Sequence, residues 1–232
     1  MIKKLARTIK DILRLEWDTR NKKFLKYYND ETNNDRWVVD ILKGKKNGFF
    51  IEAGAADGKK NSCTYTLERY FGWKGILVEP GYGFKRLKKN RPKSIIINKI
   101  LSSKKSEQDF ILLPKSPLSS CTKKSFDNHR NKIVHAHKGN RKFPAIKVKK
   151  DTINFKQLLK THNCPNEIDY LALDIEGSEY DVMKEFPFDK YKIKCISVEG
   201  KECSFLLKSK GYKQVRNKYN KKAPWENYFI LK

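Results

Sequence analysis

Short apolar runs alternate with amphipathic stretches along most of the chain after residue 48. Such runs are typical of buried strands, and the stretches between them carry their apolar residues on one side of a helix. The pattern therefore predicts an α/β fold built on a largely parallel sheet. The predicted strands are 49–51, 73–78, 94–101, 107–113, 170–173 and 193–198, with an antiparallel closing pair at 212–216 and 227–231, and the predicted helices are 62–71, 84–90, 179–186 and 203–209.

A glycine turn follows the first predicted strand. Gly54 and Gly58 let the backbone turn tightly and approach a ligand without a Cβ in the way. The next strand ends in Glu79, where a carboxylate can accept hydrogen bonds from a ribose. The spacing is not the G-x-G-x-x-G of dinucleotide sites, and Glu52 before the glycines would repel a pyrophosphate. The turn favours S-adenosylmethionine, which has a cationic sulfonium; the other interpretation is an ordinary tight turn with a chance glutamate.

Acidic residues end four of the predicted strands, at Glu52, Glu79, Asp174 and Glu199. The carboxyl ends of parallel strands share one edge of a sheet, and open α/β sheets bind their ligands there. We therefore expect these four side chains to lie along one edge.

The same reasoning places the end of the third strand, Leu101 and Ser102, near the cofactor. Asp174 and Glu176 are unfavourable to bring together unless a cation or a proton is shared between them. The alternative is that these two acids only cap the following helix and anchor its loop.

Five segments of the chain resemble the FkbM-type family of S-adenosylmethionine-dependent O-methyltransferases: 50–58, 62–68, 72–80, 168–179 and 196–199. The resemblance implies a Rossmann-like class I methyltransferase fold, with a seven-stranded mixed sheet flanked by helices and an antiparallel final strand. Cys63 departs from the asparagine that relatives often have. The resemblance implies cofactor contacts by Glu52, Gly54, Ala55, Asp57, Gly58, Ser62 and Glu79.

Members of this family usually methylate a sugar hydroxyl of a glycan or a glycosylated metabolite, so the resemblance implies a carbohydrate acceptor. Methyl transfer to an alcohol requires alignment of the oxygen with the methyl group and removal of a proton. A divalent metal can lower the pKa of the hydroxyl. We therefore expect Asp174 and Glu199 to bind Mg²⁺ or Mn²⁺, with Glu176 as a third ligand and all three as catalytic residues. Without a metal, Asp174 or a histidine of the 114–150 segment would be the general base.

Two other functions stay open. An RNA 2′-O-methyltransferase fits the basic charge, but such enzymes generally need lysines beside the catalytic acid, and the neighbours of Asp174 are Leu173 and Ile175. The other hypothesis is a binding protein that has kept the fold but has no catalytic activity. The intact glycines and the acids at the strand ends argue against this hypothesis.

The sequence also predicts two additions to the sheet domain. A basic amphipathic helix over 2–28 opens an N-terminal helical extension, 1–48, which packs on its own domain or on a partner, or lies on an anionic membrane. The methyltransferase domain is then 49–232. Within it, 114–150 reads as a lid or substrate loop rich in Pro, Ser, Lys and Arg, which includes His129, His135 and His137.

The formal net charge is +26, from 52 Lys and Arg against 26 Asp and Glu. Such a field attracts anionic partners, although lysine scattered along the whole chain is equally explained as the default surface residue. Five cysteines without metal spacing argue against a disulfide scaffold or a zinc site and favour a reducing, cytoplasmic setting. No apolar run is long enough for a transmembrane segment, and the start lacks the features of a secretory signal.

Overall fold

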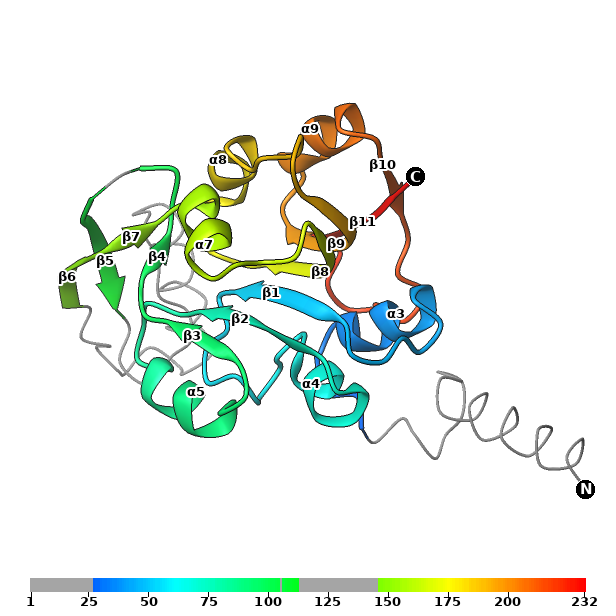
Figure 1. Cartoon of the computed structure of the whole chain (residues 1–232), viewed down its shortest axis with the longest axis horizontal. Coiled ribbons are helices and arrows are strands. Elements are labelled where there is room, and N and C mark those ends of the chain that lie inside the picture. The colour runs from blue at the N-terminus through cyan, green and yellow to red at the C-terminus, as the bar shows by residue number, and fades with distance from the viewer. Residues whose placement is uncertain (1–26, 105, 113–145) are drawn as a thin grey trace, which may run out of the picture.

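The structure is a computed structural model that describes residues 27–104, 106–112 and 146–232. A seven-stranded sheet forms its centre (Figure 1), in the order β10-β11-β9-β8-β1-β2-β3. The strands β3, β2, β1, β8 and β9 pair in parallel, whereas β11 is antiparallel to both β9 and β10. The predicted mixed sheet with an antiparallel closing pair is therefore confirmed. The bounds are β1 Phe49–Ala53, β2 Lys74–Val78, β3 Ile95–Ile97, β8 Glu167–Leu173, β9 Lys192–Glu199, β10 Tyr212–Val215 and β11 Glu226–Leu231.

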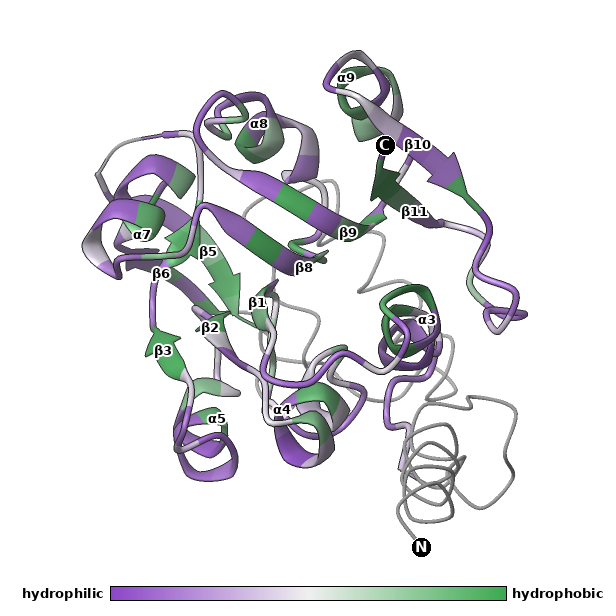
Figure 2. Cartoon of the chain, turned by 45° about the vertical axis from the view of Figure 1, so that its right-hand side comes forward, coloured by the Kyte–Doolittle hydropathy of each residue, from purple (hydrophilic) through white to green (hydrophobic). Residues whose placement is uncertain are grey.

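Helices cover both faces of the sheet (Figure 1). One face carries α7 (Phe155–Thr161), α8 (Glu179–Lys184) and α9 (Cys203–Ser209), and the other carries α3 (Asn34–Ile41), α4 (Tyr65–Phe71) and α5 (Phe84–Asn90). Successive residues of a strand point to opposite faces, so the central strands must be apolar throughout. In Figure 2 the middle of β8 and β9 is accordingly hydrophobic. Ile51 and Leu171 lie in the core beneath α7–α9, while Phe50 and Tyr170 lie in the core beneath α3–α5.

The third predicted strand, 94–101, is wrong as one element. The chain forms β3 (Ile95–Ile97), turns at Asn98, and then forms β4 (Ile100–Leu101), which pairs with β7 (Thr152–Ile153) in a separate small sheet. The Asn98 side chain donates a hydrogen bond of 2.7 Å to the carbonyl of Glu79. This contact holds the turn against the end of β2 and diverts the chain from the main sheet.

The ends of the predicted 114–150 loop are held together by a short ladder. β5 (Gln108–Leu112) pairs antiparallel with β6 (Ile146–Lys150), so that Leu112 lies opposite Ile146. Residues 146–150 therefore form a strand and not part of the loop. The rest of the loop, with His129, His135 and His137, lies outside the described residues.

Most of the predicted 2–28 helix also lies outside the described residues. The helix α3 that follows is buried against the sheet: Trp37, Val38 and Val39 belong to the same core as Phe50 of β1. Residues 34–41 therefore pack as part of the sheet domain, and the division at residue 49 is not visible as a break in the core. No helix of the described part of the chain is long and apolar enough to cross a membrane.

Candidate active site at the carboxyl edge of the sheet

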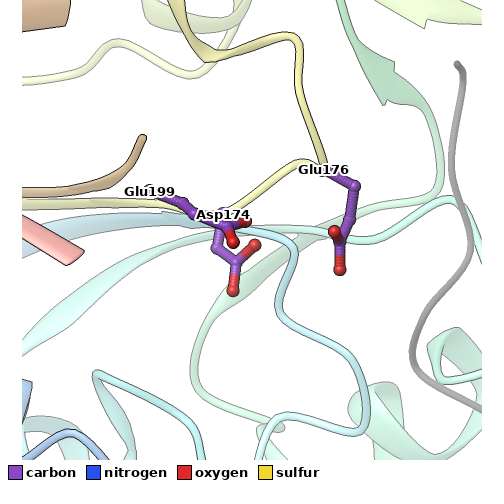
Figure 3. Close-up of side chains that lie close together, drawn as sticks. All are labelled: Asp174, Glu176 and Glu199. Atoms are coloured by element: carbon purple, nitrogen blue, oxygen red, sulfur yellow. The ribbon is translucent and has the colours of Figure 1, made fainter. Parts of the chain in front are cut away.

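Three carboxyl groups meet at the carboxyl ends of two neighbouring strands. Asp174 directly follows β8, Glu176 lies in the loop beyond it, and Glu199 is the last residue of β9. Leu173 pairs with Val198, which brings the two strand ends together. One carboxylate oxygen of each acid lies within 4.8 Å of the others (Figure 3). The prediction that Asp174, Glu176 and Glu199 gather is met by this geometry, while their catalytic role stays a prediction.

The electrostatics of this acid cluster (Asp174, Glu176 and Glu199) are unfavourable without a compensating positive charge. Asp174 is an exposed residue, although the protein atoms around its carboxyl group partly desolvate that group. This desolvation, together with repulsion from Glu176, Glu199 and Glu226, raises the pKa of Asp174 well above its usual range. A proton or a cation shared among the three acids would relieve the repulsion. Three carboxylates at this separation fit a hard divalent cation, which prefers oxygen ligands.

The loop that carries Glu176 is held in an unusual conformation. Glu176 has a φ of 63°, a left-handed conformation that non-glycine residues rarely adopt, and Gly177 follows with a φ of 97°. The carboxylate of Glu179, in the first turn of α8, accepts hydrogen bonds from the backbone N–H of Ile175 and of Gly177. Strain of this kind persists only where the surroundings impose it. Glu179 therefore holds the loop so that Glu176 is directed toward Asp174.

The glycine turn packs directly against this acid cluster. Gly54 has a φ of 85°, and a Cβ built on it would lie 1.8 Å from the carbonyl oxygen of Asp174. The N–H of Asp174 in turn donates to the carbonyl of Ala53. At Gly58, a Cβ would meet the side chain of Leu87 at 2.2 Å. Both glycines are thus required by contacts within the protein itself, and the turn adjoins the acids.

Glu79 stabilises the glycine turn through hydrogen bonds with its backbone. Its carboxylate accepts hydrogen bonds from the N–H of Ala56 at 2.8 Å and of Gly81 at 2.5 Å. Burial raises the pKa of Glu79 to about 7, while these two N–H groups oppose the shift. Ala56 has a φ of 46°, so the turn is strained at this point as well.

Glu52 lies in a closed, buried network away from the acid cluster. Its carboxylate accepts hydrogen bonds from the hydroxyls of Ser62 and Thr64 and from the N–H of Cys63. The guanidinium of Arg91 lies 3.9 Å away and also donates to both hydroxyls. Burial raises the pKa of Glu52, with Arg91 as the main opposing influence. The four acids lie at the carboxyl ends of parallel strands, as expected. Along this edge Asp174 and Glu199 come together, while Glu52 and Glu79 each have their own partners.

The remaining predicted cofactor residues lie in or near the turn. Ala55 is buried against the core, and Asp57 accepts hydrogen bonds from the N–H of Lys59 and Lys60. Leu101 is buried in β4, and the hydroxyl of Ser102 accepts the N–H of Lys104. Contact of any of these residues, or of Glu52 and Ser62, with the cofactor stays a prediction.

Sequence reasoning missed one acid of this region, Glu226. It begins β11 and lies directly opposite Glu199 in the antiparallel ladder. The amide of Asn34 in α3 donates to it at 3.1 Å and accepts from the hydroxyl of Tyr228. Burial raises the pKa of Glu226 to about 7, and Glu199 contributes to the shift. The sequence predicted the pairing of the last two strands, but this pairing does not specify that β11 also pairs with β9, or the register that places Glu226 opposite Glu199.

The strand order, with an antiparallel strand next to five parallel ones, the glycine turn after β1 and the acids after β8 and β9 define a class I methyltransferase fold of the S-adenosylmethionine-dependent type. The chain belongs to the FkbM methyltransferase family: the model described as "Methyltransferase FkbM domain" matches residues 52–208, more than half of the chain. The predicted family and fold class are thus confirmed.

Several solved structures show low similarity to this chain. The methyltransferase domain of METTL16 is 15% identical over 85% of this chain and 65% of that chain, with a TM-score of 0.44. A precorrin-6y C5,15-methyltransferase from Geobacter metallireducens GS-15 is 8% identical over 84% and 85% of the two chains, with a TM-score of 0.39. TrmK from M. capricolum, in complex with S-adenosylhomocysteine, is 9% identical over 83% and 65%, with a TM-score of 0.39. A comparison with curated proteins found no match.

Proposed function

We propose that this methyltransferase transfers the methyl group of S-adenosylmethionine to a hydroxyl oxygen of a sugar, in a glycan or a glycosylated metabolite. The observation that carries the proposal is the group of three carboxylates within 4.8 Å of one another, directly beside the glycine turn. A hydroxyl acceptor must lose a proton, and this group is suited to take it. In the reaction the S–CH₃ bond breaks, an O–CH₃ bond forms, and the hydroxyl proton passes to a carboxylate.

Two arrangements of the acid cluster are compatible with this role. In the first, Asp174, Glu176 and Glu199 would hold Mg²⁺ or Mn²⁺, which supplies a positive charge that lowers the pKa of an alcohol. In the second, no metal binds, and Asp174 is the general base. The raised pKa of Asp174 makes it a stronger base than an ordinary carboxylate.

The second candidate function is RNA 2′-O-methylation, which the net charge of +26 favours. The acid cluster opposes it, because phosphates would approach three carboxylates at the point of reaction. RNA binding that weakens steeply with salt, together with transfer to an oligoribonucleotide, would support this candidate. A cytoplasmic location is part of the proposal and follows from the reduced state expected for the cysteines.

Calorimetric titration with S-adenosylhomocysteine is the first test, carried out with Mg²⁺ or Mn²⁺ and again with EDTA. Binding in the micromolar range is the expected result, and absence of binding in both conditions would favour a non-catalytic binding protein. A separate titration with the metal alone distinguishes the two arrangements of the acid cluster. Transfer of labelled methyl groups to a panel of methyl glycosides then tests the acceptor class.

A further inference from the structure

Two large aromatic side chains are exposed on segments that connect to the acid cluster. Trp225 is 54% exposed and Tyr180 is 42% exposed. No ring, hydrogen-bond or ion partner of either side chain occurs among the described residues. Aromatic rings of this size usually gain from burial, and tryptophan and tyrosine are enriched where proteins contact ligands and partners.

The backbone of Trp225 is fixed next to Glu199. Its carbonyl accepts hydrogen bonds of 3.0 Å from the N–H of Gly200 and from the side-chain amide of Asn227. Gly200 directly follows Glu199, and Glu226, the residue after Trp225, is the ladder partner of Glu199. The indole is therefore attached to a rigid segment at the carboxyl edge of the sheet.

Tyr180 is similarly connected to Glu176. It follows Glu179, whose carboxylate binds the N–H groups of Ile175 and Gly177 on either side of Glu176. The first turn of α8 is therefore tied to the loop of the acid cluster. One exposed ring is thus on the segment that leads into the ladder partner of Glu199, and the other is on the helix whose first turn holds the loop of Glu176.

The local charge of this region is opposite to the charge of the whole chain. Glu226 and Glu179 add to the three carboxylates of the acid cluster, and the raised pKa of Glu226 reflects both Glu199 and Glu179. Repulsion disfavours a phosphate-rich acceptor here. A neutral sugar ring is accepted, because its hydroxyls donate to carboxylates and its C–H face is attracted to the negative face of an aromatic ring.

From these contacts we infer that Trp225, assisted by Tyr180, holds the acceptor by stacking on the C–H face of a neutral sugar ring, and so determines specificity. This inference rests on the proposed function, which supplies the methyl-transfer reaction.

The test is nuclear magnetic resonance of the full chain labelled with ¹⁵N at tryptophan. The chain has four tryptophans, of which Trp37 and Trp73 are buried. The spectrum of Trp225→Phe assigns the Trp225 indole signal. Titration with methyl glycosides of neutral hexoses and 6-deoxyhexoses should shift this signal saturably and leave those of Trp37 and Trp73 in place. Absence of a shift with every glycoside would overturn the inference.

Two alanine variants provide the matched comparison. We expect Trp225→Ala to weaken glycoside binding at least tenfold, measured by saturation-transfer difference spectra, and to raise KM with little change in kcat. Phe205→Ala removes a ring that is 87% exposed on α9 and should leave the affinity unchanged. Equal losses in the two variants would mean non-specific association and would overturn the inference.

The outcomes separate this inference from the proposed function. Methylation of a glycoside with an unchanged KM in Trp225→Ala would retain the proposed function and remove the stacking role. Glycoside binding at Trp225 without any methyl transfer would retain the stacking role and remove the proposed function. A shift of the Trp225 signal with an oligoribonucleotide but not with glycosides would overturn the sugar assignment.

Discussion

Two groups of acids at the same edge of the sheet have opposite surroundings. Glu52 of β1 is buried with three hydrogen-bond donors and the guanidinium of Arg91. Asp174, after the neighbouring strand β8, is surrounded by further carboxyl groups, with Glu176 and Glu199 closest. Arg91 thus compensates the charge of the first acid, whereas the second group brings three carboxyl groups within 4.8 Å of one another.

The difference suggests that Glu52 contributes to the stability of the fold and that the acid cluster contributes to the reaction. A buried acid that is fully paired is part of the folded framework, and removing its partner leaves an unpaired charge in the interior. Acids held close together repel one another, and binding of a cation, a proton or a substrate hydroxyl relieves that repulsion. Changes in the first group should therefore affect unfolding, and changes in the second should affect catalysis.

The largest effect is expected for Asp174→Asn. Loss of the base or metal ligand should lower methyl transfer by about 10²–10⁴-fold, whereas the melting temperature should stay the same or rise because a repelling charge is removed. Transfer of labelled methyl groups and thermal unfolding measure the two quantities. Asp181→Asn, an exposed acid of α8, is the control and should change neither. Wild-type turnover in Asp174→Asn would exclude Asp174 from the mechanism.

Arg91→Met should have the largest effect on stability. The guanidinium is buried, lies 2.9 Å from Glu68 and donates to the carbonyl of Gly58. Its removal leaves Glu52 and Glu68 uncompensated, so the free energy of unfolding should fall by about 3–5 kcal/mol. Denaturant unfolding measures this change.

The exposed Arg69→Met in α4 serves as the control for this variant. The double variant Glu52→Gln with Arg91→Met should lose less stability than the sum of the two single changes. Strict additivity would show that the two side chains do not act as a pair.

Gly54→Ala tests the contact between the glycine turn and the acid cluster. The new Cβ would overlap the carbonyl of Asp174, and the backbone would keep a left-handed conformation, so we expect a loss of about 3 kcal/mol. Gly211→Ala is a matched control, since Gly211 has a φ of 90° but nothing within 4 Å of its Cβ position. It should lose about 1 kcal/mol. Equal losses would mean that conformation alone requires Gly54.

A different effect is expected from Asp30, a buried acid for which no guanidinium partner occurs within residues 27–104, 106–112 and 146–232. Burial raises its pKa to about 8, with repulsion from Asp35 adding to the shift. A raised pKa means that the folded state binds the proton more tightly than the unfolded state. The stability that this contributes is complete below about pH 4 and is lost as the pH rises toward 8.

Asp30→Asn should therefore flatten the dependence of unfolding free energy on pH between pH 4 and 8. Asp109→Asn is the control. Hydrogen bonds from Lys147 and Lys149 lower the pKa of Asp109 to about 2, so it stays ionised over this range and its replacement should leave the slope unchanged. An unchanged slope in Asp30→Asn would show that other acids cause the dependence.

Much of the fold could be predicted because it depends on short-range patterns. The apolar runs of β1, β2, β8 and β9 and the amphipathic helices between them are visible in the sequence, since each element must bury its own apolar residues. The break at Asn98 was missed because a side-chain contact with the end of β2 causes it. No local pattern reports a contact with a residue so distant in the chain.

The candidate site, too, has features that the sequence shows and features that depend on distant contacts. The position of an acid at each strand end is a property of the sequence, and so is the family to which residues 52–208 belong. The partners of each acid depend on tertiary structure: Arg91, directly after α5, lies near Glu52, and Glu226 of β11 lies opposite Glu199. Sequence alone therefore determined the order of the elements and the acids that end them. Only the tertiary structure decided which acid lies near a guanidinium and which acids lie near one another, because these distances join groups far apart in the chain.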